Sequence, residues 1–236
     1  MTTDNKVAII TGASKGLGRE IASLYAQHSF NLAIAARGEA ALAEITDELS
    51  RITEVVSLAI DVSENAERLV DATLDRFGRI DVLVNNASEL GPSPMPNLED
   101  LRWQDMERIL RVNVTAPLHL AQLALPHMRA RSQGVIINVS SDAGVEAYPG
   151  WGGYGASKAA LEHLSRVLAE ELKDTAVRVY VVDPGDMQTE MHAAAEPGVD
   201  LSHLPGPEVA APEFLRLVEE ETAVFGRFQA QAALVS

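Results

Sequence analysis

A phenol and an ammonium group stand four residues apart in the segment Tyr154-Gly155-Ala156-Ser157-Lys158. On a helix, side chains four residues apart share a face and lie close together. A tyrosine ionises near about pH 10, and a neighbouring ammonium group favours the phenolate, which lowers the pKa of the phenol toward the range of efficient proton transfer. The pair therefore suits general acid/base catalysis. Because the motif is common by chance, a solvated surface pair is the alternative interpretation.

A glycine-rich segment, Thr11-Gly12-Ala13-Ser14-Lys15-Gly16-Leu17-Gly18, follows the first apolar run of the chain, and a helical pattern begins directly after it. Glycine permits a tight turn and a close approach of backbone to a pyrophosphate, while the free N–H groups and dipole of the following helix favour the anion. A glycine-rich turn without a ligand is the alternative, but the position between strand and helix favours a dinucleotide. We predict that the cofactor contacts Gly12, Ser14, Lys15, Gly16, Leu17 and Gly18.

Two basic residues predict which dinucleotide binds. At the end of the second strand, an acidic residue selects the 2′-hydroxyl of NAD, whereas a basic residue accommodates the 2′-phosphate of NADP. The sequence there has Arg37 and no carboxylate until Glu39, and Lys15 adds a second positive charge. Unless both are merely solvated surface charges, the cofactor is NADP(H), with Arg37 dominant because a guanidinium group binds phosphate bidentately.

The elements that position these residues alternate between short apolar runs and longer helical patterns. Several runs are apolar without alternation, as strands covered on both faces by helices should be. This order is typical of βαβ units, so we predict an α/β fold with a doubly wound parallel sheet of the Rossmann type in a single domain over 1–236. We expect strands at 6–11, 31–36, 55–60, 80–84, 134–139 and 177–182, and helices at 17–28, 39–51, 64–77, 99–130 and 155–172.

The composition is that of an acidic globular protein without cysteine. The 236 residues are 47% hydrophobic and carry a formal net charge of −15, a field that repels phosphate backbones and anionic membranes. We therefore expect no nucleic-acid and no membrane partner. The absence of cysteine excludes disulfides and thiolate chemistry. The six histidines show no ligand-like spacing, so we expect no metal, and without a signal or spanning segment we expect a cytoplasmic protein.

The spacing Gly-x-x-x-Gly-x-Gly resembles the turn of the short-chain dehydrogenase/reductase family, and further motifs of that family occur in order along residues 11 to 189. Asn85-Asn86-Ala87 matches the family's Asn-Asn-Ala-Gly motif, with Ser88 in place of the glycine, which puts the geometry of that loop in question. Ser141 precedes Tyr154 by thirteen residues (154 − 141 = 13), as the family's catalytic serine does, with Ser140 as the neighbouring alternative. The other matching residues are Asp61, Val62, Asn113, Pro184, Gly185 and Thr189.

The resemblance implies an NADP(H)-dependent carbonyl reductase or alcohol dehydrogenase. In it, Tyr154 exchanges a proton with the substrate oxygen, Lys158 binds the nicotinamide ribose and lowers the pKa of the tyrosine, and Ser141 hydrogen-bonds the substrate oxygen. Asn113 would hold a water that links Lys158 to solvent. The implied cofactor contacts further include Asp61, Val62, Asn85, Ala87, Tyr154, Lys158, Pro184, Gly185 and Thr189, and the implied assembly is a homodimer or homotetramer through the two long helices.

Two rival functions stay open at this point. The extended short-chain family of epimerases and dehydratases also uses Tyr-x-x-x-Lys, but the glycine spacing and the short chain argue against it. The second is a catalytically inactive NADP(H)-binding sensor or scaffold, although such proteins usually lose the tyrosine, lysine or serine. The substrate is expected to be an apolar or aromatic carbonyl or alcohol, because Tyr148, Trp151, Met187 and Met191 lie in the segments that form the pocket walls. Residues 187–212, rich in proline, are expected to form a mobile lid over it.

Overall fold

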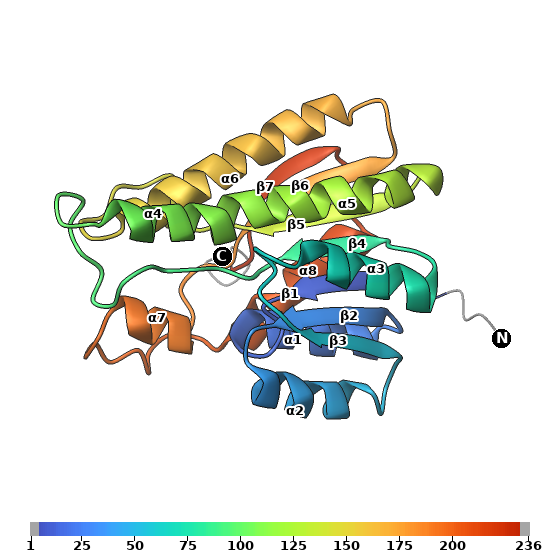
Figure 1. The fold of residues 1–236 in the computed structure, drawn as a ribbon, viewed down its shortest axis with the longest axis horizontal. Coiled ribbons are helices and arrows are strands. Elements are labelled where there is room, and N and C mark those ends of the chain that lie inside the picture. Colours follow the sequence, from blue (N-terminus) through green and yellow to red (C-terminus); the bar gives the residue numbers. More distant parts are fainter. Residues whose placement is uncertain (1–4, 232–236) are drawn as a thin grey trace.

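Seven parallel strands form one sheet with helices on both of its faces (Figure 1). The computed structural model describes residues 5–231. The strand order is β3-β2-β1-β4-β5-β6-β7, and every neighbouring pair is parallel. The predicted α/β fold with a doubly wound sheet is confirmed. The strands are β1 (Val7–Thr11), β2 (Asn31–Ala36), β3 (Val55–Ala59), β4 (Val82–Asn85), β5 (Gly134–Val139), β6 (Val177–Asp183) and β7 (Phe225–Gln229).

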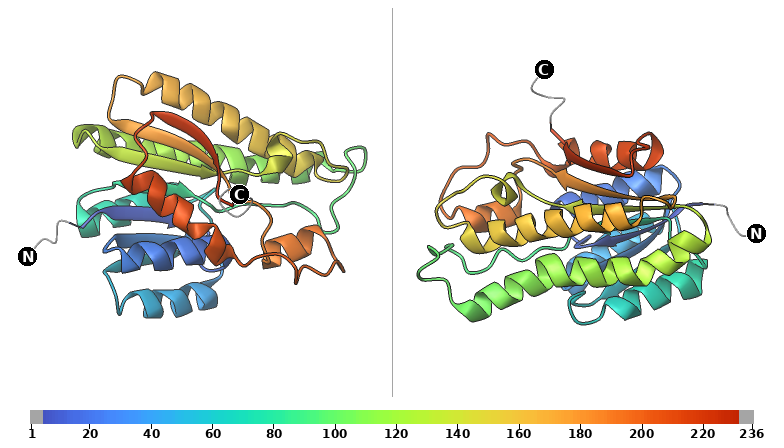
Figure 2. Two further views of the ribbon diagram at one scale, coloured as in Figure 1. Left: turned by 180° about the vertical axis from the view of Figure 1, so that it is seen from behind. Right: turned by 90° about the horizontal axis from the view of Figure 1, so that it is seen from above.

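The central strands bury both of their faces, which explains why they are apolar without alternation. Successive side chains on a strand point to opposite faces, so Ile10 enters one core cluster and its neighbour Ile9 enters the other. The first cluster lies under α1 (Gly16–Gln27), α2 (Glu39–Leu49) and α8 (Ala211–Glu219). The second lies under α3 (Ala66–Phe77), α5 (Ala116–Ala130) and α6 (Gly152–Glu171), and Figure 2 shows α5 and α6 running side by side.

The topology fixes where a ligand can bind. Strand β1 pairs with β2 on one side and with β4 on the other. The strands up to β3 are added on one side of β1 and the strands from β4 onward on the other, so the strand order reverses next to β1. In open α/β sheets of this kind, ligands bind at such a switch point, beyond the carboxyl ends of the strands. The glycine-rich turn follows β1 at this edge, and the Asn85-Asn86-Ala87 motif follows β4 beside it.

The structure differs from the sequence prediction in four places. The helix predicted over 99–130 begins as α4 (Trp103–Leu110) and continues through a π-helical segment, Arg111–Thr115, into α5. The irregular stretch 187–212 contains α7 (Glu190–Ala195), whose first turn is capped by the Thr189 hydroxyl accepting from His192 N at 3.2 Å. The C-terminal elements α8 and β7 are not predicted at all.

Over residues 5–231, no helix has the length and apolarity that crossing a bilayer requires.

Candidate active site

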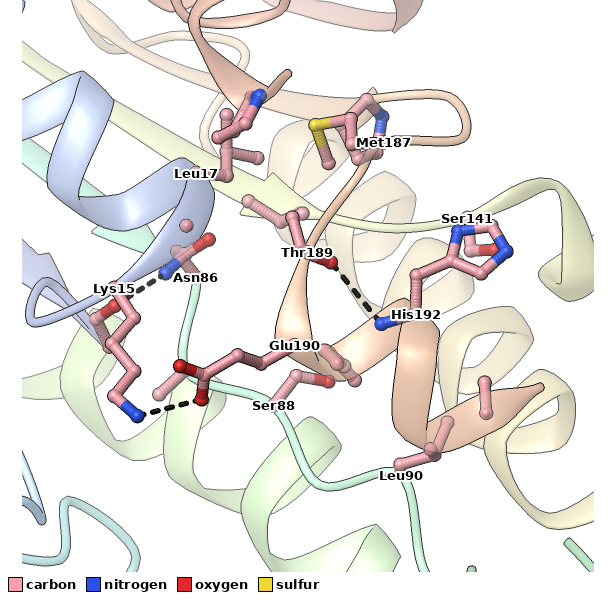
Figure 3. A pocket seen from close by; sticks show the side chains of 18 of the residues that line it. Lys15, Leu17, Asn86, Ser88, Leu90, Ser141, Met187, Thr189, Glu190 and His192 are labelled. Carbon is pink, nitrogen blue, oxygen red and sulfur yellow. Dashed lines mark hydrogen bonds and ion pairs between the residues drawn. The ribbon is translucent and has the colours of Figure 1, made fainter. Parts of the chain in front are cut away.

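A cleft of about 790 Å³ opens at the carboxyl ends of the strands, at the switch point (Figure 3). Its volume falls in the usual range for cofactor and ligand sites. It brings together segments that are far apart in the sequence: the glycine-rich turn, the ends of β2 to β6, the start of α6 and the stretch that contains α7. Of the predicted site residues, those that line the cleft are Gly12, Ser14, Lys15, Gly16, Leu17, Arg37, Asp61, Val62, Ala87, Ser141, Tyr154, Lys158, Pro184, Gly185 and Thr189.

The glycine-rich turn forms a cradle that only glycine can build. Gly12 has a φ of 67°, and a Cβ there would lie 2.8 Å from Asn86 Nδ2. A Cβ on Gly18 would lie 2.4 Å from the carbonyl oxygen of Gly12. The first turn of α1 has no acidic residue, and its N-cap, Lys15, makes no side-chain capping bond. Helix N–H groups without a capping side chain suit an anion, so these residues fit the pyrophosphate of a dinucleotide.

Three predicted residues lie behind the cleft wall and do not line it: Gly18, Asn85 and Asn113. Asn85 is buried, and its Nδ2 donates to Asn138 Oδ1 at 2.8 Å. The next residue, Asn86, lines the cleft instead, and its Nδ2 donates to the carbonyl oxygen of Thr11 at 2.8 Å. Side chains alternate at the end of a strand, which is why the two asparagines diverge. The sequence prediction therefore missed Asn86 as the one that supports the turn.

Tyr154 and Lys158 lie on the first turns of α6, and both are buried. The Lys158 side chain is 2% exposed, so the pair is not a solvated surface pair. Lys158 Nζ donates to the carbonyl oxygen of Val139 at 2.8 Å and lies 5.2 Å from the centroid of the Tyr154 ring. Burial disfavours the ammonium form and lowers the pKa of Lys158 to about 8.

The pKa of Tyr154 departs from the sequence prediction. Burial raises the pKa of this phenol well above its ordinary value, a hydrogen bond with Ser88 acts in the opposite direction, and the charges of Asp183 and Asp142 raise it further. The prediction that Lys158 lowers the pKa of Tyr154 is therefore wrong for this arrangement. Lys158 directs its ammonium group to the Val139 carbonyl oxygen, and the cost of desolvating a phenolate in the wall of the cleft outweighs the other effects.

The two serines after β5 have different partners. Ser140 is buried, and its hydroxyl donates to Glu162 Oε1 at 2.7 Å. The Ser141 hydroxyl lies at the cleft and donates to Asp142 Oδ1 at 2.9 Å. The geometry thus gives the Ser140 hydroxyl a buried structural partner and leaves the Ser141 hydroxyl bonded only within its own loop at the cleft.

Strand β7 supplies an arginine that the sequence analysis missed. Arg227 Nε donates to Glu162 Oε1 at 3.0 Å, and its Nη2 lies 3.6 Å from Asp183 Oδ2 and 3.5 Å from the carbonyl oxygen of Ser141. One guanidinium group thereby ties the serine loop to α6 and to the end of β6. The clue to this arginine was Glu162, which lies one turn after Lys158 on α6. On the buried face of that helix an acidic side chain requires a partner, and Glu162 is only 3% exposed.

Asn113 lies inside the π-helical segment, a local widening that is frequent at functional sites. Its Nδ2 donates to Ser157 Oγ at 2.9 Å, and Ser157 Oγ in turn donates to the carbonyl oxygen of Tyr154 at 2.6 Å. Its Oδ1 accepts from Glu89 N at 2.7 Å. Asn113 therefore fastens the loop after β4 to the helix that carries the tyrosine.

Both basic residues predicted for the 2′-phosphate flank the cleft, and each is paired with a carboxylate. Lys15 Nζ lies 2.7 Å from Glu190 Oε2 of α7, a pair that crosses the mouth of the cleft (Figure 3). Arg37 Nη1 lies 3.4 Å from Glu89 Oε2. The Lys15–Glu190 pair is exposed on both sides and contributes little free energy, so a phosphate group can compete for Lys15. In the other pair Glu89 is largely buried while the Arg37 guanidinium is exposed.

The expected pocket walls are more polar than the sequence predicted. Trp151, Met187 and Met191 line the cleft, and Tyr148 and Trp151 line an adjoining pocket of about 410 Å³. That pocket also contains carboxylates and histidines: Asp142, Asp186, Glu196, His192 and His203. A substrate here would meet an aromatic wall together with hydrogen-bonding groups.

A doubly wound sheet that carries a glycine-rich turn and a buried tyrosine–lysine pair in one cleft defines a nucleotide-dependent oxidoreductase. The protein-family model for short chain dehydrogenases matches residues 6–200. An uncharacterized oxidoreductase of Staphylococcus epidermidis is 36% identical over 186 residues, which are 79% of this chain and 80% of the relative. The chain belongs to the short-chain dehydrogenase family.

Solved structures of relatives extend the likeness over nearly the whole chain. A short chain dehydrogenase from Shigella flexneri complexed with NADP is 29% identical, with a TM-score of 0.85 over 98% of each chain. A 7α-hydroxysteroid dehydrogenase complexed with NADH and 7-oxo glycochenodeoxycholic acid is also 29% identical, with a TM-score of 0.86 over 96% of this chain and 92% of the other. Both nicotinamide cofactors thus occur among proteins with this fold.

Proposed function

We propose that the protein is an NADP(H)-dependent carbonyl reductase or alcohol dehydrogenase. The observation that carries the proposal is that Ser141, Tyr154 and Lys158 line the same cleft as the glycine-rich turn. A dinucleotide held at that turn and a substrate held at Ser141 would share one cavity. A metal is not part of the proposal.

In carbonyl reduction, Tyr154 donates its phenolic proton to the carbonyl oxygen, and in alcohol oxidation it accepts the proton back. Ser141 donates a hydrogen bond to the same oxygen after its hydroxyl leaves Asp142, and so stabilises the developing negative charge. The nicotinamide cofactor supplies or accepts the hydride. Lys158 would bind the ribose hydroxyls, and Asn113 would hold a water that links Lys158 to solvent.

The inactive sensor or scaffold is the second candidate. NADPH oxidation with a panel of ketones, diketones and aldehydes separates the two, because the enzyme turns over at least one carbonyl class whereas the module binds NADPH without consuming it. The aromatic wall and the polar groups of the adjoining pocket support a substrate with an apolar or aromatic body and hydrogen-bonding substituents. Binding of NADPH with no turnover across the panel would favour the module.

Exchange of the charges at the end of β2 is expected to reverse the cofactor preference. We expect the wild type to prefer NADPH, and Ala36→Asp combined with Arg37→Gln to lower kcat/KM for NADPH at least about tenfold, because a charged hydrogen bond to the phosphate is lost and a repulsive carboxylate is added. The ratio of kcat/KM for the two cofactors measures the effect. Arg51→Gln, which removes an exposed arginine outside the cleft, is the matched control. Wild-type preference for NADH would show that Arg37 and Lys15 are surface charges.

The remaining expectations concern the environment of the site. We propose a cytoplasmic homodimer or homotetramer that pairs through α5 and α6, which sedimentation at micromolar concentration tests.

We also propose that 187–212 closes over the bound substrate. Hydrogen exchange with and without NADP⁺ tests it.

A further inference from the structure

The loop that follows β4 carries a carboxylate, Glu89, that is held in place through its backbone. Asn113 Oδ1 accepts from Glu89 N at 2.7 Å, and Asn113 Nδ2 donates to the carbonyl oxygen of Glu89 at 2.9 Å. The preceding residue, Ser88, stands where the related motif has glycine, but it has no positive φ, so its backbone conformation does not require glycine. The loop therefore gives Glu89 a defined position, and its side chain is largely buried.

Two guanidinium groups from different elements contact the Glu89 carboxylate. Arg37, which directly follows β2, has its Nη1 at 3.4 Å from Glu89 Oε2. Arg108, in the last turn of α4, has its Nη2 at 3.2 Å from Glu89 Oε1. Arg37 lines the cleft, whereas Arg108 is not part of its wall. One carboxylate thus joins the arginine predicted to bind the 2′-phosphate to a second arginine outside the cleft.

The contacts are divided so that Arg37 can leave while Glu89 stays paired. The contact with Arg37 is single and longer than the roughly 3.2 Å at which ordinary N–H···O hydrogen bonds end. The other oxygen, Glu89 Oε1, keeps Arg108 and also accepts from Gly91 N at 3.2 Å. A buried carboxylate that loses its only cation is strongly destabilised. Because Arg108 remains, the departure of Arg37 does not leave Glu89 in that state.

The balance of charge leads to the same result. The negative charge of Glu89 neutralises Arg37 and would repel a phosphate group that approaches it. Arg108 compensates the charge of Glu89, so this group of three side chains has one positive charge to offer to a phosphate. The charge of Arg37 also acts on Asp61 in the wall of the cleft, but Asp61 has the compensating charge of Arg111 as well.

We propose that Glu89 and Arg108 determine how tightly the protein binds the 2′-phosphate of the cofactor, although neither contacts it. Arg108 holds and neutralises Glu89, and this releases Arg37 to form the strong, charge-assisted hydrogen bonds that a guanidinium group makes with phosphate. Both are positioning residues that act through Arg37. The inference rests on the function proposed above, because NADP(H) has this phosphate and NAD(H) lacks it.

Calorimetric titration with NADPH and NADH tests the inference without turnover. Arg108→Gln should lower the affinity for NADPH by about tenfold, because Glu89 then retains Arg37. Glu89→Gln should raise it, because it removes the competing charge and keeps the backbone bonds to Asn113. In the Glu89→Gln background, Arg108→Gln should cause no further loss. The affinity for NADH should change by less than about twofold in all three variants.

Arg111→Gln is the matched control. It removes the same charge from the π-helical segment that follows α4, where the carboxylate partner of Arg111 is Glu64 at 3.8 Å. An equal loss of NADPH affinity in this control would assign the effect to the overall field. A loss from Arg108→Gln that persists in the Glu89→Gln background would show that Arg108 acts on the phosphate by itself. A loss in Glu89→Gln would show that the carboxylate orients Arg37. Each of these three results would overturn the inference.

Two adenosine fragments separate the 2′-phosphate from the rest of the cofactor. Adenosine 2′,5′-bisphosphate lacks the nicotinamide half, and AMP differs from it in lacking the 2′-phosphate. We expect Arg108→Gln to weaken binding of the bisphosphate and to leave AMP unchanged. Equal weakening of both would place the effect in the fold of the loop, which overturns this inference and leaves the proposed function standing. A wild type that binds NADH more tightly than NADPH would instead contradict the proposed cofactor, and this inference with it.

Discussion

Tyr154→Phe is expected to lower kcat for carbonyl reduction by about 100- to 10,000-fold, the usual contribution of a positioned acid or base. The change removes only the hydroxyl group that carries the transferable proton. The ring keeps its edge-on contact with Trp151, at a centroid distance of 5.8 Å, and the Lys158 ammonium group keeps its bond to the Val139 carbonyl oxygen. Steady-state kinetics with NADPH measures the loss, and thermal unfolding and NADPH titration should show that the fold and the cofactor affinity are nearly unchanged.

Tyr180→Phe is the matched control, because it makes the same chemical change away from the cleft. Its hydroxyl donates to the carbonyl oxygen of Ala223 at 2.8 Å, so this variant should lose a little stability and no catalytic rate. A Tyr154→Phe enzyme that kept more than about a tenth of the wild-type rate would rule out Tyr154 as the acid, since acid catalysis contributes far more than that.

The sequence predicted β1 to β6, and for the five central strands of the sheet the signal is burial itself. Apolar runs such as Val7–Thr11 and Asn31–Ala36 are buried at every position. A short, continuous apolar run is typical of a strand that helices cover on both faces. Strand β7 was not predicted because it lacks that burial. Phe225–Gln229 lies at the edge of the sheet, is only half-buried and contains an arginine and a glycine, so its composition carries no strand signal.

The spacing of the site residues was readable from the sequence, but their electrostatics was not. Motif order predicted that Ser141, Tyr154 and Lys158 meet, and all three line one cleft. The direction of the Tyr154 pKa depends on how deeply the fold buries the phenol and on which atom the lysine contacts. Likewise, the hydrogen bonds that Asn113 makes from its π-helical segment reach Glu89 and Ser157, which are 24 and 44 residues away in the sequence.

Lys158→Met is expected to impair catalysis and cofactor affinity while making the protein more stable near neutral pH. Burial lowers the pKa of Lys158 from its ordinary value of 10.5 to about 8. Holding a charged lysine there costs about 3 kcal/mol, at about 1.4 kcal/mol for each pH unit. Methionine fills a similar volume without a charge, although the Val139 carbonyl oxygen loses its donor. We therefore expect a gain of about 1 to 3 kcal/mol in the free energy of unfolding.

The pH dependence identifies the source of that gain. Between about pH 8 and the unfolded value of 10.5, the unfolded chain binds the Lys158 proton and the folded chain has released it. Stability of the wild type should therefore rise with pH through this window. The penalty is fully present below about pH 8, so the advantage of Lys158→Met should be largest there and shrink toward zero as the pH approaches 10.5. Urea unfolding at several pH values measures it, with Lys173→Met, an exposed lysine, as the control.

Lys158→Met could instead be inactive and have a lower free energy of unfolding than the wild type at every pH. That result would show that Lys158 is a structural anchor for the Val139 carbonyl oxygen. Unchanged NADPH affinity in the same variant would separately contradict its role in holding the ribose. Lost activity with a stability gain that fades as the pH rises would place Lys158 among residues kept for function at a cost to the fold, as charged groups in active-site clefts often are.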